Sequence, residues 1–305
     1  MSPNIPLSEQ VVVITGASAG IGAALAQVLA KQFPGIRLVL AARNQSKLET
    51  TATYCSKAGA EVLVVPTDMS QVEQVEALAR AAILRFGGVN ALVNNAGYGQ
   101  MGPLEYISAQ AARRQFEVNL LGPLALIRAL IPTMRDSGGG RIINVSSLGG
   151  RLAFPFGGMY SASKFALEGL SDALRMELEP FNIKVSVIEP GPVSTDFFDA
   201  AAATVDMTIV ESEKTPYRAG FEKLKGLQEQ TSSQAWTPER VAVVIVRSLT
   251  DPRPRPRYTA ATGGDLLLFL MTKVLPTWAV DRFWQKFYGI DMVAKDWQEQ
   301  LKNQK

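Results

Sequence analysis

The residues of this chain best suited to chemistry are Tyr160 and Lys164, which stand four positions apart in the run Tyr-Ser-Ala-Ser-Lys. The residues that follow suit a helix, and on a helix this spacing places both side chains on one face. A tyrosine hydroxyl titrates near ~10, and an ammonium group close to it favours the phenolate and lowers that pKa. The pair therefore fits a proton donor and acceptor, and the alternative is an ordinary amphipathic helix.

A glycine-rich turn supplies a second candidate site. Residues 8–15 have the β-branched pattern of a short strand, and they lead into Gly16, Gly20 and Gly22, after which apolar residues recur at helical spacing. In a strand, glycine turn and helix of this order, backbone N–H groups and the positive end of the helix hold a pyrophosphate. The spacing is not the common Gly-x-Gly-x-x-Gly, and a plain strand-to-helix turn is the alternative.

Composition excludes several classes of function. The 305 residues are 47% apolar, which is enough to bury the core of one α/β domain. The 31 Lys and Arg against 28 Asp and Glu give a net charge of +3, so we expect no nucleic-acid partner. No histidine occurs, which removes Ser-His-Asp hydrolysis and histidine-containing metal sites, and we expect no metal ion. The single Cys55 fits a reducing compartment, and the first residues lack a signal-peptide pattern, so we expect a cytoplasmic protein.

Apolar runs rich in β-branched residues alternate with helical patterns along the chain. Strands that are apolar throughout and alternate with helices predict a parallel sheet covered on both faces, wound through right-handed crossovers. Such a doubly wound fold binds ligands in a crevice at the carboxyl ends of its strands. The expected strands are residues 11–15, 37–41, 61–66, 91–94, 141–146 and 184–189, with a seventh at 257–260.

Several short motifs follow one another in order between residues 15 and 196, over about two thirds of the chain. They are Thr15 with the glycine turn, Asn94-Asn95-Ala96-Gly97, Asn119, Ser147, Tyr160-x-x-x-Lys164 and Pro190-Gly191. Together they closely resemble the short-chain dehydrogenase/reductase (SDR) family, and residues 147–156, 164–170 and 189–195 are most similar to its hydroxysteroid and retinol dehydrogenase branch. The resemblance implies a Rossmann fold and reversible hydride transfer between a nicotinamide and a carbon that bears oxygen.

The resemblance also implies catalytic roles. Tyr160 would exchange the proton, and Lys164 would lower the Tyr160 pKa and hold the nicotinamide ribose. Ser147, thirteen positions before Tyr160, would donate to the developing alkoxide, and only this spacing favours it over Ser146. Asn119 would hold a water in a proton relay, and the alternative is a structural amide in a helix kinked near residues 122–123.

The residue after the second strand bears on the choice of cofactor. In NAD-preferring relatives an acid about 20 positions past the glycines binds the ribose 2′-hydroxyl. Here Ala42 and Arg43 follow that strand, so we expect NADP(H) to be preferred over NAD(H), with a solvent-facing Arg43 as the alternative. Asp68 would meet the adenine or cap a helix. The cofactor-binding residues that the resemblance implies are Gly16, Ser18, Ala19, Gly20, Ile21, Gly22, Arg43, Asp68, Asn95, Ala96, Gly97, Tyr160, Lys164, Pro190, Gly191, Val193 and Thr195.

Apolar and aromatic side chains flank the catalytic segments. They favour a lipophilic ketone, aldehyde or alcohol of steroid-, retinoid- or acyl-like character, although the same residues would also suit a core. The expected substrate pocket comprises Tyr98, Ser147, Leu148, Phe154, Phe156, Met159, Tyr160 and Phe197, with Phe198 beside them.

We expect one domain over residues 1–305, in which the resemblance implies that 193–235 close over the substrate. Thr237 and Pro238 suit the cap and first residue of a helix. Residues 261–305 form a helical extension whose apolar run 266–271 is too short to span a bilayer. It would be a lid, a peripheral membrane contact, or simple packing.

The family implies a homodimer or homotetramer, paired through the helices that bear Asn119 and Tyr160. A nucleotide-sensing regulatory or scaffold protein on the same fold is the main alternative to an enzyme; such a protein can lose the Tyr and Lys, which this chain keeps. An epimerase or dehydratase is a further alternative, but that class has a differently spaced glycine turn.

Overall fold

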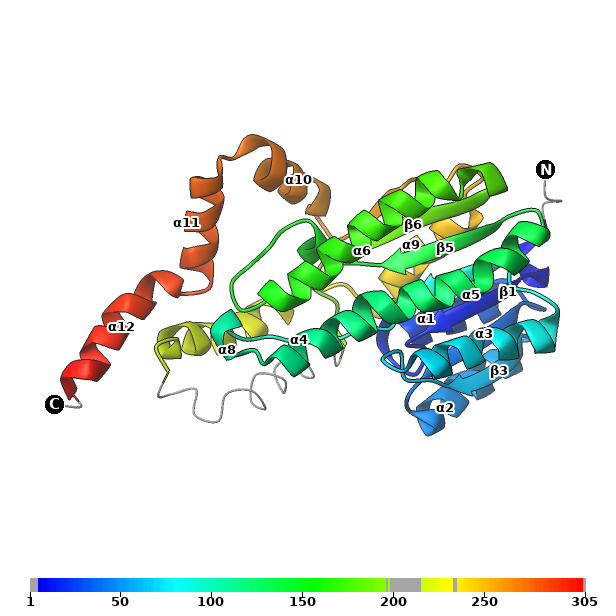
Figure 1. Cartoon of the computed structure of the whole chain (residues 1–305), viewed down its shortest axis with the longest axis horizontal. Helices are drawn as coiled ribbons and strands as arrows, with labels where there is room; N and C mark the ends of the chain where they lie inside the picture. Colours follow the sequence, from blue (N-terminus) through cyan, green and yellow to red (C-terminus); the bar gives the residue numbers. More distant parts are fainter. Residues whose placement is uncertain (1–4, 196, 198–214, 233–234, 304–305) are drawn as a thin grey trace.

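The computed structural model describes residues 5–195, 197, 215–232 and 235–303, and its centre is a seven-stranded, fully parallel sheet (Figure 1). The strand order is β3-β2-β1-β4-β5-β6-β7, so the expected doubly wound Rossmann fold is confirmed. Each predicted strand is present, with ends that differ by one residue at most. The strands are β1 Val11–Thr15, β2 Arg37–Ala42, β3 Glu61–Pro66, β4 Ala91–Asn94, β5 Gly140–Val145, β6 Ile183–Pro190 and β7 Arg257–Ala260.

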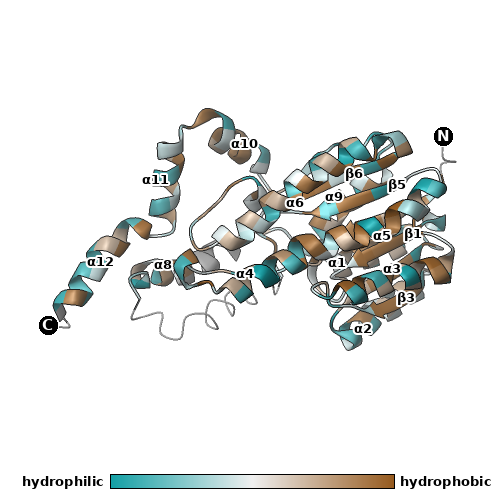
Figure 2. Cartoon of the chain, in the orientation of Figure 1, coloured by the Kyte–Doolittle hydropathy of each residue, from teal (hydrophilic) through white to brown (hydrophobic). Residues whose placement is uncertain are grey.

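Helices cover both faces of the sheet (Figure 1). Alternate residues of one strand point to opposite faces, and in β1 Val12 and Ile14 belong to one core while Val11 and Val13 belong to the other. Figure 2 shows the hydrophobic residues concentrated in the strands. The helices are α1 Gly20–Gln32, α2 Gln45–Lys57 and α9 Pro238–Thr250 on the first face, and α3 Val72–Phe86, α5 Gly122–Asp136 and α6 Gly158–Glu177 on the second.

The chain leaves β1 toward β2 on one side of the sheet and continues at β4 on the other. Strand order therefore reverses between β1 and β4, the point at which ligands bind in such sheets. The parallel register pairs Thr15 with Ala41 and Asn94 with Asn144, so the carboxyl ends of these strands lie along one edge. Most of the motif residues follow these strand ends.

A π-helical turn, η3 Glu117–Leu121, joins α4 Ala109–Phe116 to α5. Residues 109–136 thus form one continuous helical stretch, and among the described residues it is the stretch long and apolar enough to cross a membrane by length and composition. Leu126, Ile127, Leu130 and Met134 of α5 are fully buried against the sheet and α3, so this stretch packs as a core helix.

The C-terminal extension stands away from the sheet (Figure 1). It begins after β7, and its last helix contacts α8 Arg218–Ser232 through an ion pair between Asp296 and Arg218. Thr237 caps α9 and Pro238 is its first residue, as predicted. The extension consists of α10 Gly264–Phe269, the π-helical turn η7 Leu270–Val274, α11 Thr277–Phe287 and α12 Ile290–Asn303.

Candidate active site

The glycine turn after β1 leaves room for a ligand at the start of α1. Gly16 and Gly20 have φ angles of +69° and +53°, in the left-handed region that favours glycine. A Cβ on Gly22 would lie 2.3 Å from the Gly16 carbonyl oxygen, so only glycine fits there. The N-cap residue of α1 is Ala19, which offers no side-chain acceptor. The first N–H groups of the helix therefore suit an anionic group such as a phosphate.

Thr15 and Asn95 join the glycine turn to the end of β4. The Thr15 hydroxyl accepts hydrogen bonds from the backbone N–H groups of Asn95 and Ala96, each at 3.0 Å. The Asn95 side-chain amide donates to the Thr15 carbonyl oxygen at 2.9 Å. These bonds fix the floor of the crevice, so Asn95 has a clear structural role at the position where the family resemblance places the cofactor.

Tyr160 and Lys164 lie on α6 with exposed fractions of only 8% and 4%. The Lys164 ammonium donates to the Val145 carbonyl oxygen at 2.8 Å and lies 5.9 Å from the centroid of the Tyr160 ring. Ser147 lies beside the same ring, because a Cβ on Gly149 would be 3.3 Å from Tyr160 Cε1 and 3.4 Å from Ser147 Oγ. The structure therefore brings Ser147, Tyr160 and Lys164 together.

The expected lowering of the Tyr160 pKa by Lys164 is wrong for this arrangement. Burial raises the pKa of Tyr160 to about 12, and a hydrogen bond with Ser147 acts in the opposite direction. Burial lowers the pKa of Lys164 to about 8, against the effect of the Glu168 carboxylate. The cost of desolvating each charged form decides both directions, and the ammonium is directed at Val145 rather than at the phenol.

Ser146 and Ser147 point to different surroundings. A Cβ on Gly150 would lie 2.4 Å from the Ser146 hydroxyl oxygen, which faces Glu168 and lowers the pKa of that carboxyl. Ser147 instead accepts from the Gly149 N–H at 3.0 Å and hydrogen bonds to Tyr160. The geometry thus places Ser147 at Tyr160, as the spacing predicts.

Asn119 is fully buried in the π-helical turn, and its amide is well partnered. It donates to the Tyr98 carbonyl oxygen and to the Ser163 hydroxyl, both at 3.0 Å, and accepts from the Tyr98 N–H at 3.2 Å. A Cβ on Gly97 would lie 3.2 Å from Asn119 Oδ1 and 3.5 Å from Lys164 Nζ. Asn119 therefore satisfies a distorted helix and also lies near Lys164.

The segment after β6 faces the glycine turn. A Cβ on Gly20 would lie 3.2 Å from Thr195 Cγ2, and Val193 pairs with Trp236. Gly191 passes close to Ala261, because a Cβ there would lie 2.8 Å from the Ala261 Cβ. A cavity of about 280 Å³ is lined by residues of α1, of this segment and of the start of α9: Gly20, Ala23, Ala24, Gln27, Ser194, Thr195, Pro238 and Glu239.

Arg43 and Asp68 lie at the outer end of the same crevice. Arg43 is exposed just beyond β2. Burial would raise the pKa of Asp68, but hydrogen bonds from Ser70 and the charges of Arg43 and Arg114 lower it. Asp68 accepts from the Ser70 N–H at 2.9 Å, whereas the cap of α3 is Gln71, so the cap role considered for Asp68 is wrong.

The expected pocket residues separate into two groups. Phe197 lies 5.6 Å from Tyr160 between ring centroids, and a Cβ on Gly149 would meet the Phe154 ring at 3.1 Å, so both are near the phenol. Phe156 is buried against Phe221 of α8 at a φ of +64°, so it takes the core role. Leu148 lies beside Gly191, Tyr98 and Met159 are half-buried, and Phe198 lies outside the described residues.

The sequence did not single out the aromatic residues that cover this side of the site. Tyr288 stacks on Phe154 with ring centroids 5.7 Å apart, and Trp284 of α11 lies 6.5 Å from the same ring. The aromatic residues concentrated in the run 283–288 indicate a packing surface. The sequence does not show that this surface contacts Phe154, because Phe154 is far away along the chain.

Comparison with known proteins identifies the family. The family model described as short chain dehydrogenase matches residues 10–206. The chain belongs to the short-chain dehydrogenase/reductase family. Human 17-beta-hydroxysteroid dehydrogenase type 1 is 32% identical to this SDR over 83% of this chain and 77% of its own, which supports the hydroxysteroid-like branch.

Two further relatives span almost the whole SDR chain. The 3-ketodihydrosphingosine reductase of Bacteroides thetaiotaomicron is 31% identical over 93% of this chain and 100% of its own. A short-chain dehydrogenase/reductase from Burkholderia phymatum, solved in complex with NAD, superposes with a TM-score of 0.77 and 31% identity over 88% of this chain and 94% of its own.

The crevice of this SDR fits a nicotinamide cofactor, which the family binds. The helix start without a side-chain cap suits the pyrophosphate, and the glycines at 16 and 22 cannot carry a side chain without backbone clashes. Gly97 keeps the space beside Asn119 and Lys164 open. Groups that could bind a dinucleotide and groups that could move a proton thus line one edge of the sheet.

Proposed function

We propose that this chain is an NADP(H)-dependent oxidoreductase that interconverts a lipophilic ketone or aldehyde and the corresponding alcohol. The observation that carries the proposal is the buried Tyr160 with Ser147 and Lys164 around it, at the carboxyl edge of the sheet. A regulatory protein that only sensed the nucleotide would need the glycine turn but not these three side chains gathered around one buried phenol.

Tyr160 is the proposed general acid and base. When bound, the cofactor supplies the hydride to the carbonyl carbon, and in the same direction the Tyr160 proton passes to the carbonyl oxygen. Ser147 donates a hydrogen bond to that oxygen as its negative charge develops. A phenol with a raised pKa of about 12 stays protonated at neutral pH and so is ready to donate.

Lys164 and Asn119 restore the Tyr160 proton in this proposal. With a pKa of about 8, the Lys164 amine can release or accept a proton near neutral pH, and both Lys164 Nζ and Asn119 Oδ1 border the open space at Gly97. The Asn119 carbonyl oxygen already accepts from Tyr98 at 3.2 Å and retains a lone pair for a water molecule. Lys164 would also hold the nicotinamide ribose.

The cofactor preference rests on Arg43. It follows Ala42, which occupies the position where an acid would bind the ribose 2′-hydroxyl, and its exposed guanidinium suits a 2′-phosphate. The Burkholderia relative binds NAD, so the preference has to be tested on this chain itself.

The relatives and the aromatic wall support a lipophilic substrate. One relative is named for a hydroxysteroid and another for 3-ketodihydrosphingosine, and both compounds are largely apolar. We propose that Phe154 and Phe197 contact such a substrate, with α11 behind Phe154. Residues 196, 198–214 and 233–234 of the segment 193–235, which we expect to close over the substrate, lie outside the described residues.

We also propose a cytoplasmic homo-oligomer, a homodimer or homotetramer, that touches membranes through its extension. Leu121, Phe165 and Met176 are exposed on η3 and α6, where the family resemblance places the subunit contact. Trp278 of α11 is 73% exposed, which suits an interfacial helix.

The deciding experiment measures NADPH oxidation with a panel of steroid, retinoid and acyl carbonyls, with NADH in parallel. Tyr160→Phe keeps the ring but loses the proton, so we expect kcat to fall by about 10²- to 10⁴-fold while NADPH binding persists. Turnover unaffected by the substitution would reject the role of Tyr160. Tight NADPH binding by the wild type, without turnover of any carbonyl, would favour the sensor instead.

A further inference from the structure

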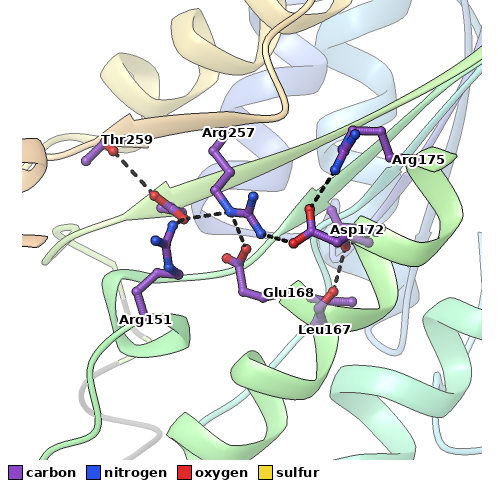
Figure 3. Close-up of polar contacts among 10 residues, drawn as sticks. Arg151, Leu167, Glu168, Asp172, Arg175, Arg257 and Thr259 are labelled. Carbon is purple, nitrogen blue, oxygen red and sulfur yellow. Dashed lines mark hydrogen bonds and ion pairs between the residues drawn. The ribbon is translucent and has the colours of Figure 1, made fainter. Parts of the chain in front are cut away.

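A network of ion pairs around two buried carboxylates joins α6 to β6 and β7 (Figure 3). Arg257 of β7 donates to Glu168 at 3.0 Å and to Asp172 at 2.6 Å, both on α6, and lies 3.5 Å from Glu189 of β6. Arg151 pairs with Glu189 from the other side at 3.0 Å. Only 5% of Glu168 and 1% of Glu189 are exposed. Burial of a carboxylate costs desolvation free energy unless a cation nearby balances its charge.

Glu168 lies one helical turn beyond Lys164, on the same face of α6. Gly150 packs against both side chains, because a Cβ there would lie 3.2 Å from Glu168 Cγ and 3.3 Å from Lys164 Cβ. The same Cβ would meet the Ser146 hydroxyl at 2.4 Å. The absence of a side chain at Gly150 thus lets the stems of Glu168 and Lys164 pack against the same buried backbone position.

The charges around Glu168 and Lys164 act on one another. The Glu168 carboxylate raises the pKa of Lys164, against the larger lowering by burial. The pKa of Glu168 is itself raised by burial and by Glu189, whereas Ser146 and Arg257 act in the opposite direction. The other charged groups of the network are Asp172 and Arg175 on α6 and Arg151 after η4 Leu148–Gly150. Arg257 is therefore the cation of this network that favours the ionised form of Glu168.

We propose that Glu168 is a positioning residue for Lys164: its carboxylate, held by Arg257, favours the ammonium form of the buried Lys164 amine, so that Lys164 carries a proton when it has to restore the one on Tyr160. The inference rests on the proposed function, in which Lys164 serves the proton exchange of Tyr160. The ion pairs of Arg257 with Glu168 and Glu189, which join α6 to β6 and β7, would hold this carboxylate in place.

Loss of the Glu168 charge has a defined sign. Without the carboxylate, burial acts on Lys164 unopposed, so its amine loses its proton at a lower pH. The alkaline limit of carbonyl reduction then moves to a lower pH as well, because Lys164 is already a neutral amine there. At acidic pH both forms of the enzyme keep the ammonium, and their rates should agree.

The test uses Glu168→Gln, which keeps the side-chain volume and an oxygen that accepts from Arg257. The Lys164 titration is measured in the full-length protein by NMR of ¹³Cε-labelled lysine, with Lys164→Arg identifying the signal. We expect the midpoint to move down by ~1 pH unit. The alkaline limb of kcat/KM for carbonyl reduction should move by the same amount. Asp172 lies one helical turn beyond Glu168, and its carboxylate accepts from the same Arg257 guanidinium. The control variant Asp172→Asn removes that carboxylate charge and should leave both midpoints unchanged.

A second variant guards against loss of folding in Glu168→Gln. Arg257→Gln leaves Glu168 in place but removes the cation that favours its ionised form, so the Lys164 midpoint should again move down, with no further shift in the double variant. An unchanged Lys164 midpoint in both variants would overturn the proposal. If the midpoint moves while the wild type reduces no carbonyl, the coupling of Glu168 to Lys164 stands and the proposed function fails.

Discussion

Arg43 is the side chain on which the proposed cofactor preference depends. Arg43→Ala removes a pair of charge-assisted hydrogen bonds to a 2′-phosphate. One hydrogen bond to a charged group contributes about 1.5–3 kcal/mol. We expect kcat/KM for NADPH to fall by about 10- to 100-fold, while kcat/KM for NADH changes little. Arg37→Ala is the matched control, because Arg37 is at the opposite end of β2, bonded to the Glu9 carbonyl oxygen. A parallel loss with both cofactors would contradict the preference.

At the level of single residues, the sequence predicted which side chains meet but not their electrostatics. Ser147, Tyr160 and Lys164 come together because strand ends and one helix turn are fixed by local pattern. The pKa directions of Tyr160 and Lys164 depend on burial by segments from elsewhere in the chain, which local spacing does not encode. Glu168 went unnoticed for the same reason, since Arg257, its partner, is 89 residues away.

At the level of elements, alternation of apolar runs was enough to locate all seven strands, because both faces of a parallel strand are buried. The π-helical turn at Asn119 was foreseen only as a kink, since its hydrogen-bond pattern depends on Tyr98 and Ser163. The helices of the extension were expected, but nothing in their pattern distinguishes a lid from a membrane contact. The structure shows aromatic side chains on both sides of α11, with Trp284 facing inward and Trp278 exposed.

The outer side of α11 should bind lipid in our proposal. Trp278 is exposed beside η7, where Val274 and Leu275 are also exposed, and Lys273 and Arg282 can reach anionic headgroups. In a sedimentation assay with phosphatidylglycerol vesicles, we expect the wild type to pellet and Trp278→Ser to remain largely in the supernatant. Val243→Ser, which changes a 54% exposed residue of α9, should sediment like the wild type. Equal sedimentation of all three would leave α11 without a lipid role.

At the scale of the whole molecule, subunit pairing would explain why apolar side chains remain exposed on η3 and α6. Leu121 and Phe165 are 48% and 44% exposed on these two neighbouring elements, and exposed apolar side chains that gather on one face mark a protein contact. In an oligomer paired through this face, Phe165→Asp would place a charge in a desolvated contact. We expect light scattering to give a multiple of 33.0 kDa for the wild type and the single-chain mass for the variant.

The matched control for this prediction is Leu84→Asp. Leu84 on α3 is 91% exposed, more than Phe165, yet it is far from the face that bears Asn119 and Tyr160. Its substitution should leave the oligomer intact, so a general effect of a new surface charge can be told apart from loss of a specific contact. A weakening of the subunit dissociation constant by about 30-fold or more, confined to Phe165→Asp, would place the contact on α6. A wild type that scatters light as a single chain would instead remove the oligomer from the proposal and leave the exposed face to another partner.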